Sequence, residues 1–229
     1  MNEPSASSVR VWDLPTRLFH WMLAAAVSGS LICAKIGGGA MAWHFWFGYT
    51  VFALIAFRIL WGLVGGRWSR FASFIYAPGT VLRYLRGQSR ADEHVDVGHS
   101  PLGSFSVFAL LSVLAAQVAT GLVADDEIAT VGPLNRLVNS DLALSATSWH
   151  KSFGQWAVFG LIGLHIAAIV YYVLIKKRIL VRPMISGDKA LPLGTPVTAD
   201  GFGSRAFAVV LALLCGAVVT WVVRLGLAG

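Results

Sequence analysis

Five long runs of apolar residues occupy most of the chain, and shorter polar segments separate them. An α-helix needs roughly 20 apolar residues to cross about 30 Å of hydrocarbon. The runs are too long for strands and do not alternate between apolar and polar positions, as the strands of a membrane barrel do. The pattern therefore predicts five membrane-spanning helices, at residues 18–36, 42–65, 104–124, 149–175 and 205–227.

The composition agrees with this interpretation. Hydrophobic residues make up 56% of the 229 residues and charged residues only 13%, about half the charged share of an ordinary soluble domain. We therefore expect an all-α fold, an integral membrane helical bundle, in which the fifth helix is peripheral.

The net charge of +7 reflects topology and does not indicate a nucleic-acid partner. Most lysines and arginines fall on one side of the predicted spans, and only Lys35, Arg136, Lys151 and Arg224 fall on the other. Positive residues accumulate on the cytoplasmic side of membrane proteins. We therefore expect a cytoplasmic N-terminus, a periplasmic C-terminus and membrane lipid as the surroundings.

The segments between the spans contain two weaker signals. APGTVLRYLRG and LNRLV each predict a short helix. The tract 88–100 is polar, and we expect it to be mobile, with His94 and His99 solvated. The only cysteines, Cys33 and Cys215, lie inside predicted spans and form no CxxCH signature, so covalent attachment of a c-type haem is not indicated.

Four histidines lie in apolar surroundings: His20, His44, His150 and His165. His150 and His165 share one predicted helix, fifteen residues apart, so they lie within roughly 60° of one another and about 22 Å apart along its axis. The alternating direction of the helices places His44 level with His150 and His20 level with His165. The sequence therefore predicts two histidine pairs at two depths.

Such pairs favour haem over a simple metal site. Two neutral imidazoles facing each other across a bundle can ligate a haem iron from both sides, whereas zinc normally takes four ligands. A single membrane histidine could also be a hydrogen-bonded packing residue. Ala24, Gly48 and Gly154 each follow one of these histidines by four residues, which would leave room for a flat macrocycle.

Haem propionates are acids that need partners at membrane depth. Arg17 and Arg58 would suit a haem at the inner pair, and Lys151 would suit one at the outer pair. For Arg17 and Lys151 the alternative is that each side chain reaches from the span to the membrane surface.

Several stretches resemble one known family, the bacterial cytochrome b561 and nickel-hydrogenase b-type cytochromes. They are VRVWDLPTRLFHW, WHFWFGYTVFALIAFRILWGLVGGRWSRF, GHSPLG and WHKSFGQWAVFGLIGLHIAAIVYY. The resemblance covers roughly residues 9–190. It implies a helical bundle that binds two haem b groups through His20, His44, His150 and His165 and that transfers electrons between the membrane quinone pool and a redox partner.

The leading hypothesis is therefore a dihaem electron-transfer protein of the bacterial inner membrane, either on its own or as a subunit of a membrane oxidoreductase. Residues 1–190 would form a four-helix dihaem domain, and residues 191–229 a linker and the fifth helix. The partner would be a periplasmic c-type cytochrome or hydrogenase, and a bound quinone is left open. The alternatives are a transporter or channel that uses the histidines for metal or protons, and an anchor subunit without redox function.

Overall fold

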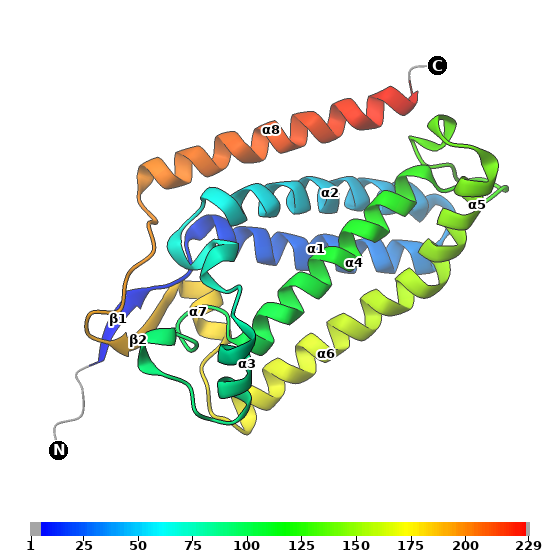
Figure 1. The fold of residues 1–229 in the computed structure, drawn as a ribbon. Helices are drawn as coiled ribbons and strands as arrows, with labels where there is room; N and C mark the ends of the chain where they lie inside the picture. Colours follow the sequence, from blue (N-terminus) through cyan, green and yellow to red (C-terminus); the bar gives the residue numbers. More distant parts are fainter. Residues whose placement is uncertain (1–5, 228–229) are drawn as a thin grey trace. The chain divides into compact units, whose positions relative to one another are not determined.

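The computed structural model describes residues 6–227, and five of its helical segments are long and apolar enough to cross a membrane. Four of them are α1 (Leu14–Ile36), α2 (Met41–Val64), α4 (Pro101–Val123) and α8 (Phe202–Leu227) (Figure 1). The other is composite: it begins as α5 (Ser140–Trp149), passes through a π-helical turn, η6 (His150–Gly154), and continues as α6 (Gln155–Leu174). The predicted all-α membrane bundle with five spans is confirmed.

All five spanning segments begin before the predicted residues, and polar side chains cap the two that differ most, α1 and α5. The carboxylate of Asp13 accepts a hydrogen bond from the backbone N–H of Thr16 at 2.8 Å, so α1 begins at residue 14. The side-chain oxygen of Asn139 accepts one from the N–H of Leu142 at 2.9 Å and starts α5. Such caps satisfy N–H groups that have no partner inside the helix.

The connecting segments contain short elements. These are β1 (Ala6–Arg10), α3 (Pro78–Leu85), α7 (Val181–Ser186), β2 (Asp188–Pro192) and the 3₁₀ turns η1 (Gly38–Ala40), η2 (Arg67–Ser69), η3 (Phe71–Ser73), η4 (Ala91–Glu93) and η5 (Asn135–Leu137). The short helix in APGTVLRYLRG is confirmed as α3, whereas LNRLV forms only the 3₁₀ turn η5. The antiparallel pairing of β1 with β2 was not predicted.

The chain divides into two compact units, which we describe separately. Unit 1 comprises Met1–Phe19, Arg58–Phe108 and His165–Val209, and unit 2 comprises His20–Phe57, Ala109–Leu164 and Val210–Gly229. The helices α1, α2, α4, α6 and α8 each contribute to both units. The division into a dihaem domain at 1–190 and a linker with a fifth helix at 191–229 stays a prediction.

Four helices meet in the apolar core of unit 2. This core is formed by Ala26 and Val27 from α1, Val51 and Ile55 from α2, Leu114 from α4 and Val158 from α6. Small residues let the helices approach closely, as is usual in membranes. A Cβ added at Gly29 would lie 2.7 Å from the ring of Phe47, so α1 and α2 could not pack in this way with a larger residue there.

In unit 1, Asp13 joins the beginning of α1 to the end of α2. Its side chain is fully buried and accepts hydrogen bonds from Ser69 Oγ at 2.8 Å, the Gly66 N–H at 3.1 Å and Trp61 Nε1 at 3.3 Å. A Cβ at Gly66 would collide with this carboxylate. The buried charge is thus satisfied by several donors, which is what makes its burial tolerable.

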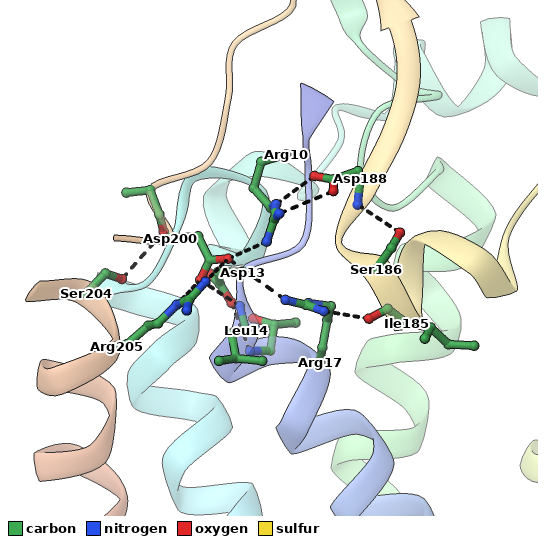
Figure 2. A network of polar contacts seen from close by, with 12 residues as sticks. Arg10, Asp13, Leu14, Arg17, Ile185, Ser186, Asp188, Asp200, Ser204 and Arg205 are labelled. Carbon is green, nitrogen blue, oxygen red and sulfur yellow. Dashed lines mark hydrogen bonds and ion pairs between the residues drawn. The ribbon is translucent and has the colours of Figure 1, made fainter. Parts of the chain in front are cut away.

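A second carboxylate, Asp200, ties the start of α8 to the N-terminal strand (Figure 2). Asp200 accepts hydrogen bonds from Arg10 at 2.7 Å, the Leu14 N–H at 2.9 Å and Arg205 at 3.0 Å, and Arg10 also contacts Asp188 at 2.7 Å. Burial acts to raise the pKa of Asp200, but the hydrogen bonds from Arg205, Leu14 and Arg10 outweigh it and lower the pKa below its ordinary value of 3.8.

The tract 88–100 differs from the prediction of a solvated segment. The ring of His99 lies 4.7 Å from that of Trp12 and 4.4 Å from that of Phe74, and His94 lies 5.8 Å from Trp68. Val97 is buried in the same region. The two histidines are therefore packed rather than solvated, because their flat rings fit against aromatic side chains as well as apolar residues do.

The Asp200 network predicts that D200N loosens the paired strands. Hydrogen bonds to charged groups contribute roughly 1.5–3 kcal/mol, so we expect a loss of about 2 kcal/mol and roughly 30-fold faster amide exchange in β1 and β2. Hydrogen–deuterium exchange measures this directly. The control is D92N, which changes an exposed carboxylate on η4 and should leave the exchange unchanged; similar acceleration in both variants would contradict the assignment.

The sign of the pH dependence follows from the lowered pKa. The stabilisation by Asp200 is complete above its ordinary value of 3.8 and is lost as the pH falls through the lower folded value. After correction for the intrinsic pH dependence of amide exchange, the protection of the wild-type strands should therefore fall only in acid, whereas D200N should lack this acid-dependent loss of protection.

Candidate cofactor site

The structure brings together the histidines predicted to form the outer pair. His44 on α2 and His150 on η6 both belong to unit 2. Their ring centroids lie 6.1 Å apart, and their ring planes are nearly perpendicular, at 88°. Both residues are half-buried.

Backbone carbonyls determine which ring nitrogen carries the proton. His44 Nδ1 lies 3.0 Å from the carbonyl oxygen of Ser30, and His150 Nδ1 lies 2.9 Å from that of Gln117. A carbonyl oxygen can only accept, so each Nδ1–H is the donor. Each Nε2 therefore keeps a lone pair for a metal, which is the arrangement found when histidine binds metals through Nε2.

The two rings line one cavity, and cavities between the helices of a bundle are a usual place for a cofactor. Gly48 also lines it, and a Cβ added there would meet no protein atom within 4 Å. The rest of the wall is mostly apolar and comes from all four core helices, including Val27, Leu31, Val51, Leu114, Val118 and Val158.

This arrangement fits a metal held inside a prosthetic group. An imidazole nitrogen binds a first-row metal such as zinc at about 2 Å, so two rings on opposite sides of one metal have centroids about 6 Å apart, as observed here. Within residues 6–227 no three His, Cys, Asp or Glu side chains gather as a metal site. The remaining ligands must therefore come from elsewhere, and the four ring nitrogens of a porphyrin meet that requirement.

The inner histidines belong to different units. His165 on α6 is part of unit 1, where its Nδ1 lies 3.5 Å from the hydroxyl of Ser106 on α4. His20 on α1 is part of unit 2, and its ring lies 5.0 Å from that of Trp21. The pairing of His20 with His165 stays a prediction that rests on their depth in the sequence.

Arg58 is a buried cation packed among aromatic rings. Its side chain in unit 1 is only 2% exposed, and its guanidinium lies 4.7 Å from the ring of Phe71, with Phe19 and Phe74 at 5.9 and 6.0 Å. Among the residues that the structure describes, neither Nη1 nor Nη2 has a hydrogen-bond partner. The buried carboxylate of Asp13 interacts electrostatically with this cation and offsets part of the cost of its burial. The two unpartnered terminal nitrogens could still donate to a second carboxylate.

The other two predicted cations are placed differently. Arg17 donates one hydrogen bond to the carbonyl oxygen of Ile185 and lies 3.9 Å from Asp200, while its buried Nε has no hydrogen-bond partner among the described residues. Lys151 is exposed on η6, next to His150 in the chain. Both remain predicted partners of haem propionates.

Comparison with known proteins identifies the family. A family model described as prokaryotic cytochrome b561 matches residues 11–187. The chain belongs to the prokaryotic cytochrome b561 family. A protein of Bradyrhizobium diazoefficiens named "Probable Ni/Fe-hydrogenase B-type cytochrome subunit" is 25% identical over an alignment of 215 residues that covers 80% of this chain and 86% of the relative. No solved structure matches.

Membership of this cytochrome family, together with the five apolar helices, establishes a multi-pass membrane protein. It also establishes a b-type cytochrome that carries haem b and functions in electron transfer. The resemblance noted in the sequence is thereby confirmed.

The cytochrome's α4 contributes residues that sequence reasoning missed. The side-chain amide of Gln117 donates to the carbonyl oxygen of His150 at 3.2 Å, and a Cβ at Gly121 would lie 2.9 Å from His150 Cε1. The one signal in the sequence is that Gln117, Thr120 and Gly121 lie close together in the second half of a mostly apolar helix.

The prediction that Gly154 leaves room for a macrocycle is wrong. A Cβ there would collide with Oε1 of Gln117 and with the ring of Trp149. The absence of a side chain at Gly154 therefore accommodates protein atoms. Gly48 is the glycine that opens onto the cavity, as predicted.

If haem occupies this cavity, G48A should reduce haem binding without disturbing the protein. The added methyl meets no protein atom within 4 Å but projects where the macrocycle would lie, so we expect the loss of most of one bound haem. Pyridine haemochrome absorbance per chain measures it. G160A on α6 is the matched control, because its methyl also meets nothing within 4 Å; equal haem content in the two variants would rule out haem contact at Gly48.

Proposed function

We propose that this cytochrome binds two haem b groups, one between His44 and His150 and one between His20 and His165. It would transfer electrons between the quinone pool and a periplasmic redox partner. The observation that carries the proposal is the outer pair, with ring centroids 6.1 Å apart and both Nδ1–H groups bonded to backbone carbonyls.

When bound, a b-type haem supplies a reversible one-electron couple. The residues around the outer site would tune it. The hydrogen bonds from His44 to Ser30 and from His150 to Gln117 raise the basicity of the imidazoles and fix their orientation. The apolar wall would limit access of water and lower the local dielectric constant. Both effects would change the reduction potential of the haem.

Arg58 would pair with a propionate of the inner haem, with Arg17 as a second partner, and Lys151 would pair with a propionate of the outer haem. The support is strongest for Arg58, since it is 2% exposed and both terminal nitrogens are unpartnered within the described part of the chain. Asp13 supplies one nearby negative charge, and a propionate would add an acceptor for the two terminal nitrogens.

The name of the Bradyrhizobium relative supports a hydrogenase as the periplasmic partner, and a soluble c-type cytochrome is the other candidate. The uneven distribution of lysine and arginine supports insertion in a bacterial inner membrane with the N-terminus cytoplasmic and the C-terminus periplasmic. The extreme ends, residues 1–5 and 228–229, lie outside the described residues. A quinone would bind beside one of the two haems.

Replacing any one of His20, His44, His150 and His165 by alanine should remove one of two haems, because a bis-histidine iron loses an axial ligand. Haem per chain and the reduced-minus-oxidised spectrum measure the loss. H94A is the control, since His94 lies outside the spans and should leave both haems in place.

The same variants test electron transfer. Addition of a quinol to membranes should reduce both haems of the wild type but only the remaining haem, or none, in each single variant. Full haem content in a variant would disprove that ligand assignment. A correctly inserted wild-type protein without haem would instead favour a transporter or an anchor subunit.

R58Q should lower the midpoint potential of the inner haem, because removal of a positive charge disfavours addition of an electron. A unit charge at about 10 Å in an effective dielectric of about 20 contributes roughly 1.7 kcal/mol, so we expect a shift of roughly 50–100 mV. Redox titration measures it. R70Q, which changes an exposed arginine of the same unit, should cause no comparable shift; equal potentials in R58Q and the wild type would contradict the propionate pairing.

A further inference from the structure

Although α4 carries no histidine, several of its residues contact the ring and backbone of His150. We propose that Gln117, Thr120 and Gly121 are positioning residues that hold the imidazole plane of His150 perpendicular to that of His44. This inference rests on the proposed function, in which the two histidines ligate one haem. It concerns the orientation of the ligand, whereas the proposed function concerns its identity.

Gln117 contacts His150 through two hydrogen bonds that run in opposite directions. The ring donates from Nδ1 to the backbone carbonyl of Gln117 at 2.9 Å. The side-chain amide of Gln117 donates to the backbone carbonyl of His150 at 3.2 Å. One bond fixes the rotation of the ring and the other fixes the backbone that carries it, so neither can move without the other.

Gly121 and Thr120 limit the ring from the same helix. A Cβ at Gly121 would lie 2.9 Å from Cε1 and 3.3 Å from Nδ1 of His150, so the ring lies directly against the backbone of α4. Thr120 donates its hydroxyl hydrogen to the carbonyl of Ala116 at 2.7 Å. Its oxygen, 3.3 Å from His150 Nδ1, can therefore serve as a second acceptor.

The backbone at His150 departs from a regular α-helix to reach this position. Residues His150–Gly154 form the π-helical turn η6, and such turns are frequent at functional sites. A π turn adds a residue to the helical repeat, so its carbonyls lose their regular i→i+4 partners. The Gln117 amide bonds to the carbonyl of His150, and Gly154 leaves the space that the Gln117 side chain occupies.

His44 is held differently, by the carbonyl and the hydroxyl of Ser30 on α1, both at 3.0 Å from Nδ1. Because separate helices fix the two rings, their planes keep the observed angle of 88°. Perpendicular axial imidazoles leave two d orbitals of a low-spin ferric iron close in energy and produce a strongly anisotropic EPR signal. Parallel imidazoles separate these orbitals and produce a rhombic signal.

EPR of the oxidised protein tests the inference. The wild type should show a strongly anisotropic low-spin signal that is absent from H150A. In G121A the new methyl must displace the ring, so this signal should shift toward the rhombic type while the haem content stays at the wild-type value. G160A, whose methyl meets no protein atom within 4 Å, should keep the wild-type signal.

Q117L provides a second test, since it removes the amide donor but keeps the backbone carbonyl. It should shift the same signal in the same direction, and it alone decides the question if G121A does not retain haem. A rhombic signal from the outer haem of the wild type, or an unshifted signal in Q117L, would overturn the inference. Failure of the proposed function would appear differently, as full haem content in H150A.

Discussion

Two hydrogen bonds, each from an imidazole Nδ1–H to a backbone carbonyl, determine the chemistry of the outer site. In a membrane interior an unpaired N–H is costly, and helix carbonyls with a second lone pair are the acceptors at hand. Once the Nδ1–H of His44 and of His150 is bonded to Ser30 and Gln117, both Nε2 lone pairs remain available for a metal. The positions of α1 and α4 matter because they place these two carbonyls beside the rings of His44 on α2 and His150 on η6.

Buried polar groups outside this site have the same requirement and meet it in different ways. Asp13 and Asp200 are surrounded by donors and hold the ends of α1, α2 and α8 in unit 1. Arg58, by contrast, is buried among aromatic rings with both terminal nitrogens unpartnered in the described residues. The carboxylates are satisfied within the protein, whereas the terminal nitrogens of Arg58 remain available to a further acceptor beside the charge of Asp13.

Much of the fold follows from hydropathy, because a helix that crosses a bilayer must be long and apolar over its whole length. The positions of His44 and His150 along these helices are also sufficient to predict that the two rings lie together, as the structure shows. Local patterns could not reveal the pairing of β1 with β2, since the two strands are short and far apart in the sequence. The cap at Asp13 extends α1 beyond its apolar run. Hydropathy alone cannot predict this extension, because the capping residue is polar.

The outer histidine site contains contacts that could not be predicted from the sequence. Spacing placed Gly154 on the face of His150, but spacing cannot say which neighbour occupies that face, and the neighbours are Gln117 and Trp149. Gln117 and Gly121 contact His150 from another helix. No sequence motif identifies such residues. Their contribution becomes visible only when α4 and η6 are seen in contact.

The most direct test of the central claim is the reduced-minus-oxidised visible spectrum of the purified wild-type protein, with haem quantified per chain. Two haem b groups per chain are expected if both histidine pairs bind iron. One haem per chain would contradict one of the pairs, and a correctly inserted protein without haem would contradict the proposed site as a whole.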